Sequence, residues 1–147
     1  MTATDFDAGF HLFQSGDPLG TYAAGSFHFG NARYCCIEQC VHVKLFNAFE
    51  LAECRSALLE CSAPNLLRKK LKAIHKKADV ARTLTGPVIA AWKAKHLRQL
   101  IKKIYRVKMK QVDSLRDALL NTGDRVIVFA CSKDKLCDIG MAPAQFK

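Results

Sequence analysis

The stretch of residues 33–46 constrains this chain most, because it places one acid, Glu38, inside an otherwise apolar and cysteine-rich pattern. The spacing of its apolar residues predicts a helix over residues 36–46. On such a helix Glu38 and His42 lie four residues apart on one face, beside the face that carries Ile37 and Val41. A carboxylate in this setting is either a helix acid kept at the edge of the protein or a catalytic group held in a pocket.

The length of 147 residues fits one domain with a core of its own. Half of the residues are hydrophobic, which argues against disorder, and no apolar run is long enough to span a bilayer. The first residues are acidic and lack the basic and apolar regions of a signal peptide. We expect a loose leader over residues 1–12, a domain over residues 13–147, an intracellular and cytoplasmic location, and no membrane partner.

The apolar periodicity predicts four further helices, over residues 47–61, 65–78, 88–111 and 115–120. On the longest of them, Trp92 and Lys108 belong to the packed side. Alternating residues predict a short strand over 26–29, and a β-branched apolar run predicts another over 126–130. The expected fold class is therefore α+β, a mainly helical single domain with a few short β-strands.

The chain has seven cysteines, and five of them fall on expected helical positions: Cys35, Cys36, Cys40, Cys54 and Cys61. In an intracellular protein such residues act as reduced, small hydrophobic side chains. The alternative is a metal site around Cys36, Cys40 and His42. Since no second cysteine or histidine pair has a suitable spacing, we expect no metal.

The net charge of +10 is concentrated between Arg68 and Lys110, where Asp79 is the only acid. This asymmetry favours a polyanionic partner or a phosphorylated small molecule. A solvated basic surface without a ligand is the alternative. No known RNA- or DNA-binding motif accompanies the charge, so nucleic-acid association rests on the charge alone.

Two blocks along the chain suggest a specific family. The first is residues 34–39, Y-C-C-I-E-Q, followed by Lys44 six residues after Glu38. The second is Trp92 followed by Arg98 on the expected long helix. Both blocks place charged and aromatic side chains on helices.

A third block, residues 115–124, reads L-R-D-A-L-L-N-T-G-D and leads to Asp134 and Gly140. In order and spacing, the three blocks resemble the Y-x-S-x-E-[QH], W…R and L-R-x-x-L-L-x-T-G-D motifs of the NADAR superfamily, which includes the riboflavin-biosynthesis-intermediate N-glycosidases. The resemblance extends from about residue 13 to residue 141. It implies a NADAR-like fold.

What the resemblance implies chemically is hydrolysis of the bond between ribose C1′ and a base nitrogen, in a phosphoribosyl riboflavin intermediate or an ADP-ribosyl substrate. Positive charge builds on the sugar as the base leaves, and a carboxylate beside it stabilises that charge and orients water. Glu38 is the expected catalytic carboxylate, and Asp134 the second catalytic acid or ribose ligand. His42 is either a general acid or a packed core histidine. The reaction requires no cofactor.

The same resemblance suggests substrate-binding residues. Lys44 and Arg98 would hold a phosphate, Trp92 would form a wall of the pocket, and Tyr34 would stack on the base. For each residue a structural role is the alternative: a solvated helix cation for Lys44 and Arg98, and a core aromatic for Trp92.

The chain departs from the family pattern at two pairs of residues. Cys137-Asp138 replaces a Trp-Gly pair, and Gly20-Thr21 replaces a Ser-Asn pair. We expect Asp138 and Gly140 to line the substrate site. The departures also motivate a second hypothesis, a catalytically weakened module that binds ADP-ribose or a nucleotide. A basic nucleic-acid-associated protein is the third.

Overall fold

The computed structural model describes residues 4–7, 10–13 and 16–129, and confirms the mainly helical α+β class. None of the helices in this part combines the length and apolarity needed to cross a membrane. Six helices occur in it: α1 Ile37–Ala48, α2 Ala52–Leu59, α3 Pro64–His75, α4 Ala78–Thr83, α5 Gly86–Gln111 and α6 Asp113–Asn121.

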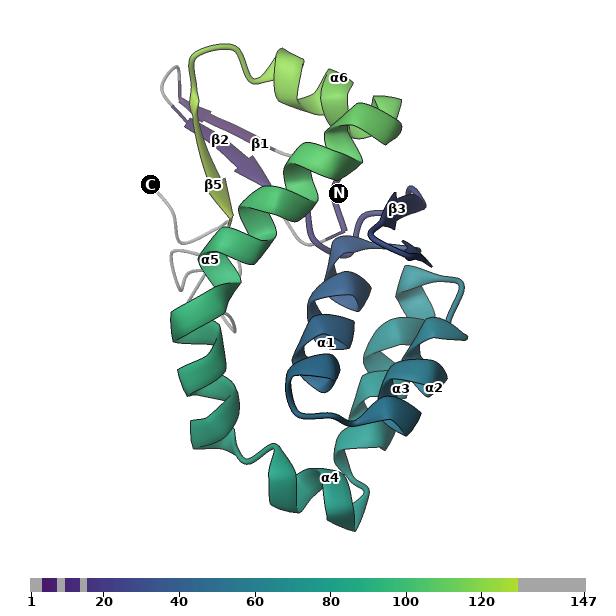
Figure 1. Ribbon diagram of the computed structural model, residues 1–147. Coiled ribbons are helices and arrows are strands. Elements are labelled where there is room, and N and C mark those ends of the chain that lie inside the picture. Colours follow the sequence, from purple (N-terminus) through teal and green to yellow (C-terminus); the bar gives the residue numbers. More distant parts are fainter. Residues whose placement is uncertain (1–3, 8–9, 14–15, 130–147) are drawn as a thin grey trace.

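Helix α1 is the centre of the fold. Figure 1 shows it between the long helix α5 on one side and α2 and α3 on the other. The buried residues of α1 lie around most of the helix circumference, and they are Ile37, Gln39, Cys40, Val41, Val43, Leu45 and Phe46. A helix that is apolar on most of its surface is stable only when other elements cover it.

The helix boundaries differ from the expected ones where the backbone turns sharply. The second helix begins at Ala52 instead of residue 47, because Glu50 adopts a positive φ of 56° and ends the preceding turn. The expected helix over 65–78 corresponds to α3 and ends at His75, since extended backbone at Lys77 separates it from α4, which the sequence did not predict. Pro64 occupies the first turn of α3, where its missing N–H leaves no hydrogen bond unmade.

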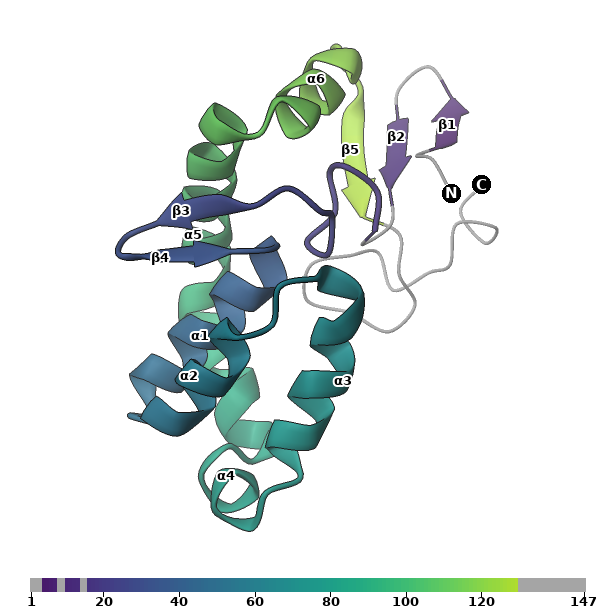
Figure 2. The same ribbon diagram turned by 90° about the vertical axis from the view of Figure 1, so that its right-hand side faces the viewer.

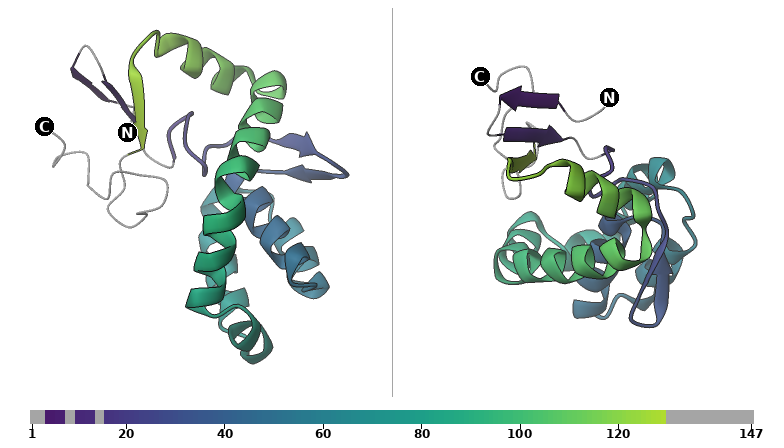
Figure 3. Two further views of the ribbon diagram at one scale, coloured as in Figure 1. Left: turned by 60° about the vertical axis from the view of Figure 1, so that its left-hand side comes forward. Right: turned by 90° about the horizontal axis from the view of Figure 1, so that it is seen from above.

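Five strands form two sheets in the described residues: β1 Thr4–Asp7, β2 Phe10–Phe13, β3 Phe27–Phe29, β4 Ala32–Tyr34 and β5 Val126–Phe129. The larger sheet has the order β1-β2-β5, with β2 antiparallel to β1 and parallel to β5. The expectation of a loose leader is therefore wrong for the described residues before position 13, because the backbone of β2 pairs with the apolar strand β5. Figure 3 shows this sheet and the β3–β4 hairpin on opposite sides of α5.

The hairpin of β3 and β4 is tied to the end of α5. Its strands pair antiparallel around Gly30, whose φ of 63° suits a tight turn. The His28 N–H donates to Gln111 Oε1 at 2.7 Å, and Gln111 Nε2 donates to the His28 carbonyl at 2.8 Å. The side chain of Gln111 thus pairs with the outer backbone edge of β3, and Figure 2 shows the hairpin beside this part of α5.

The loop before β3 is held by two polar side chains of α5. The Tyr105 hydroxyl donates to the Leu19 carbonyl at 2.5 Å, and Lys108 Nζ donates to the Ala23 carbonyl at 3.1 Å. Lys108 is buried, as expected from its place on the packed side, and its ammonium lies 5.6 Å from the centre of the Phe27 ring. Burial lowers its pKa. Together these bonds fix the loop that reaches the first turn of α1.

Gln39 joins α1 to the end of α2 through a buried amide. Its Oε1 accepts the Cys35 N–H at 2.7 Å, and its Nε2 donates to the carbonyls of Leu58 and Cys61, both at 2.8 Å. Gln39 is 1% exposed. Because these backbone groups are next to the core, losing the amide would leave them without partners.

We expect Gln39→Leu to lower the free energy of unfolding by about 3 kcal/mol, because a leucine of similar size keeps the volume but removes three hydrogen bonds to buried backbone groups. Urea unfolding monitored by circular dichroism measures the loss. The matched control is Gln99→Leu on the exposed surface of α5, which should change stability by no more than about 0.5 kcal/mol. Equal losses in the two variants would contradict a special role for the Gln39 amide.

Candidate functional site

Glu38 lies in the first turn of α1, and both of its carboxylate oxygens have a partner. The Thr21 hydroxyl donates to Oε1 at 2.9 Å, while Oε2 lies 3.3 Å from His42 Nε2. The Glu38 N–H also donates to the Thr21 carbonyl at 3.0 Å. The side chains of Glu38 and His42 are 22% and 17% exposed, so the pair is close to the surface without being fully solvated.

The position of Glu38 explains its ionisation. Burial alone would raise the pKa of its carboxyl, but the hydrogen bond and charge of His42, the Thr21 hydroxyl and the charge of Lys93 outweigh this effect, so that the pKa lies below its ordinary value. The first turn of a helix also favours an anion, because the free N–H groups there carry partial positive charge. Glu38 is therefore a carboxylate at neutral pH.

An aromatic ring, Tyr22, and a cation, Lys93, lie close enough to this carboxylate to interact with its charge, and a second cation covers the aromatic ring. Tyr22, next to Thr21, is half-buried, and the Arg68 guanidinium lies 4.3 Å from the centre of its ring. Burial, followed by the charge of Glu38, raises the pKa of Tyr22 to about 12, although Arg68 opposes the shift. Tyr22 thus remains a neutral phenol. The loop, α1, α3 and α5 each contribute to the group, through Tyr22, Glu38, Arg68 and Lys93.

His42 connects Glu38 to a second histidine. Its ring meets that of His75 edge to face, with 6.4 Å between the ring centres. Burial, together with the charges of His42 and Lys93, lowers the pKa of His75. His42 Nδ1 is buried and has no hydrogen-bond partner among the described residues. The imidazole is thus held through Nε2, which faces Glu38.

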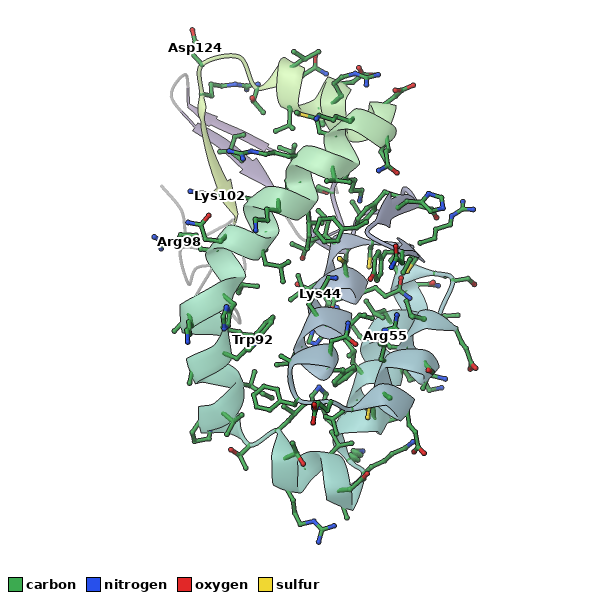
Figure 4. All side chains as sticks on the ribbon, in the orientation of Figure 1. Lys44, Arg55, Trp92, Arg98, Lys102 and Asp124 are labelled. Atoms are coloured by element: carbon green, nitrogen blue, oxygen red, sulfur yellow. The ribbon has the colours of Figure 1, made fainter. Side chains whose placement is uncertain are left out.

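The contacts of the Glu38 carboxylate given above are with Thr21 and His42, and not with the four predicted substrate-binding residues that the structure describes. Tyr34 is buried in the core, with its ring centre 5.9 Å from that of Phe27. Lys44 Nζ lies 5.3 Å from the centre of the Phe29 ring. Trp92 is half-buried and packs against the core, and Arg98 is exposed on the side of α5 turned away from α1 (Figure 4).

These placements have physical reasons. A tyrosine that ends β4 points its ring between the hairpin and α1, where it buries apolar area. Lys44 lies six residues after Glu38, a spacing that puts the two on different sides of a helix. The predictions of Tyr34 as a stacking residue and of Lys44 and Arg98 as phosphate ligands at the Glu38 site therefore receive no support from the arrangement.

The remaining predicted site residues, Asp134, Asp138 and Gly140, lie outside the described residues. Their roles stay predictions. The sequence block 115–124, which belonged to the same resemblance, forms α6 and the turn after it, at the end of the molecule where Asp124 is labelled in Figure 4.

Four cysteines are buried in the core and one is partly buried: Cys35, Cys36, Cys40, Cys54 and Cys61. Burial raises the pKa of Cys40 to about 12, which favours the neutral thiol over the thiolate that a metal requires. Within residues 4–7, 10–13 and 16–129, no group of three or more acidic, histidine or cysteine side chains is arranged to hold a metal ion.

No protein-family model, curated protein or solved structure matches the chain. The resemblance to the NADAR superfamily thus rests on the three sequence blocks, and the family remains a prediction.

Sequence reasoning missed Tyr22, Arg68 and Lys93 as members of the Glu38 group, and it treated Thr21 only as a departure from a motif. Thr21 and Tyr22 follow the Gly-containing turn, a local signal that a loop approaches another element. Arg68 and Lys93 carry no such signal, because they are two cations among many in the basic region.

We expect the stabilising contribution of the Glu38 carboxylate to disappear in acid. Its pKa is lower in the folded state than in the unfolded chain, where it is about 4.3. The contribution is therefore complete above about pH 4.3 and is lost as the pH falls through the lower folded value. Urea unfolding of wild type and Glu38→Gln between neutral and acidic pH should show the smaller acid dependence in the variant.

Two further variants test the cause of this dependence. Thr21→Val replaces the hydroxyl by a methyl group of nearly the same volume. The acid dependence of the stability of this variant should lie between those of wild type and Glu38→Gln. Glu53→Gln, an exposed acid on α2, should behave as wild type. An acid dependence of Glu38→Gln as steep as that of wild type would show that Glu38 is not stabilised as an anion.

Proposed function

We propose that this protein hydrolyses an N-glycosidic bond between ribose C1′ and a base nitrogen, in a phosphoribosyl or ADP-ribosyl substrate. The observation that carries the proposal is the ionised, partly exposed Glu38, oriented by Thr21 and His42. The sequence resemblance to N-glycosidases also points to Glu38 as the catalytic carboxylate. The proposal assigns Glu38 as the carboxylate beside the ribose.

The proposed reaction breaks the C1′–N bond, with its electron pair leaving on the base nitrogen, and forms a C1′–O bond to water. The water proton passes to solvent or to the departing base. A carboxylate with a low pKa is a weak base, so the main contribution of Glu38 is to stabilise the positive charge on the sugar. His42, whose Nε2 lies 3.3 Å from Oε2, orients this carboxylate.

The charges around Glu38 favour an anionic substrate. Arg68 and Lys93 come from different helices, and a guanidinium binds phosphate through two parallel hydrogen bonds. The ring of Tyr22 lies close enough to Glu38 for the carboxylate charge to raise the pKa of the phenol. A sugar phosphate or diphosphate would therefore find Lys93 near the carboxylate that we assign to its C1′ atom. Asp134 remains the proposed second acid.

We expect Glu38→Gln to reduce base release on the order of 10²–10³-fold, because it keeps the shape of the side chain and removes the charge that stabilises the transition state. The purified protein is incubated with a ribosylamino-pyrimidine phosphate and, separately, with guanine-linked ADP-ribose, and the free base is measured by chromatography. Glu53→Gln is the matched control and should retain wild-type activity.

The possible results separate the site from the function. If wild type releases no base from either substrate at high protein concentration, the proposed hydrolase is wrong. If base is released equally by wild type and Glu38→Gln, the activity exists but Glu38 is not its catalytic carboxylate.

A second candidate function is a module that binds ADP-ribose without cleaving it. The observation that favours it is the engagement of both Glu38 oxygens by Thr21 and His42, which leaves fewer acceptor positions for water. Calorimetry that shows tight ADP-ribose binding, together with unchanged substrate in the chromatographic assay, would select this function over hydrolysis.

A further inference from the structure

One face of α5 carries a stripe of exposed cations. The members of this stripe follow the three- and four-residue spacing that keeps side chains on one side of a helix. Arg98 and Lys102 project from α5 on the side turned away from α1 (Figure 4). The stripe consists of Lys95, Arg98, Lys102, Lys103, Arg106 and Lys110, all exposed.

Nothing on α5 itself neutralises this charge. The sequence of the helix contains no Asp or Glu over its 26 residues. The ion pairs His42–Glu38 and Arg116–Asp113 do not involve the stripe. The helix rises about 1.5 Å per residue, so the stripe from Lys95 to Lys110 is about 22 Å long.

We propose that the α5 stripe binds the sugar–phosphate backbone of double-stranded nucleic acid. A duplex presents a dense and regular row of negative charges, and a stripe of cations about 22 Å long can meet several phosphates at once. Arg98 and Arg106 add the bidentate geometry that suits phosphate oxygens. The interaction is independent of the Glu38 site.

The composition of the stripe distinguishes this partner from a membrane and from an acidic protein. A helix that lies on a bilayer inserts an apolar face beside its cations, but the apolar face of α5, including Leu97 and Ile104, is buried in the core. Protein interfaces depend on aromatic and aliphatic anchors, and the stripe consists of cations alone. Charge without an apolar anchor fits a phosphate backbone best.

The test uses a fluorescein-labelled DNA duplex of about 20 base pairs and fluorescence anisotropy over a series of salt concentrations. Wild type should bind with an affinity that falls steeply with salt. A variant without four of the cations should bind at least about tenfold more weakly at low salt, and the slope of its salt dependence should be smaller by about 0.9 for each phosphate that it no longer neutralises. The variant combines Lys102→Gln, Lys103→Gln, Arg106→Gln and Lys110→Gln.

A matched control removes the same charge from other exposed positions on α3 and the turn after it. If binding is specific to the stripe, this control keeps an affinity close to that of wild type, although its net charge is equally reduced. The control combines Lys69→Gln, Lys72→Gln, Lys76→Gln and Lys77→Gln. Thermal unfolding by circular dichroism verifies that both variants are folded.

Three outcomes would overturn the proposal. One is the absence of duplex binding by wild type, or binding that does not respond to salt. Another is an equal loss in the stripe variant and the matched control, which would show that only total charge matters. The third is binding to vesicles that contain phosphatidylserine without binding to the duplex, which would assign the stripe to a membrane surface.

Discussion

The burial of α1 is the constraint on which the rest of the structure depends. Because other elements cover most of its circumference, any polar side chain on it needs a partner or a route to solvent. Gln39 meets this requirement with three hydrogen bonds inside the protein. Glu38 meets it in the first turn, where free N–H groups favour an anion and a loop hydroxyl is within reach. The acid is thus placed where a central helix can accommodate one.

Helix α5 connects the scaffold to the candidate site. Its buried side holds the loop before β3 through Tyr105 and Lys108, and this loop supplies the Thr21 hydroxyl that orients Glu38. A change in the packing of α5 against the loop would therefore reach the carboxylate through the backbone that these two side chains hold. The exposed side of the same helix carries the cationic stripe, so the burial of one face leaves the other available for a partner.

Sequence patterns predicted α1, α5 and β5 well, because long apolar periodicity and β-branched runs reflect burial directly. They also placed Lys108 on the packed side. They failed at β1 and β2, because β2 pairs with β5, which is far away in the sequence, and at Glu50, whose positive φ follows the end of α1. For the site, they identified Glu38 and its neighbour His42. The sequence patterns did not predict that Arg68 and Lys93 belong to this group. Only the three-dimensional packing of α3 and α5 distinguishes these two cations from the many others.

The balance of charge around Glu38 restricts which ligands suit the site. Lys93 and His42 act on this carboxylate through their charge, and Arg68 lies over the ring of the neighbouring Tyr22. A neutral nucleoside would gain little from these cations and would not offset the cost of desolvating them. In the proposed reaction, a phosphate or diphosphate would interact with the cations, and Glu38 would stabilise the positive charge that develops on the sugar. The charge of Lys93, which helps to keep Glu38 ionised, therefore also favours the anionic substrate of the proposed function.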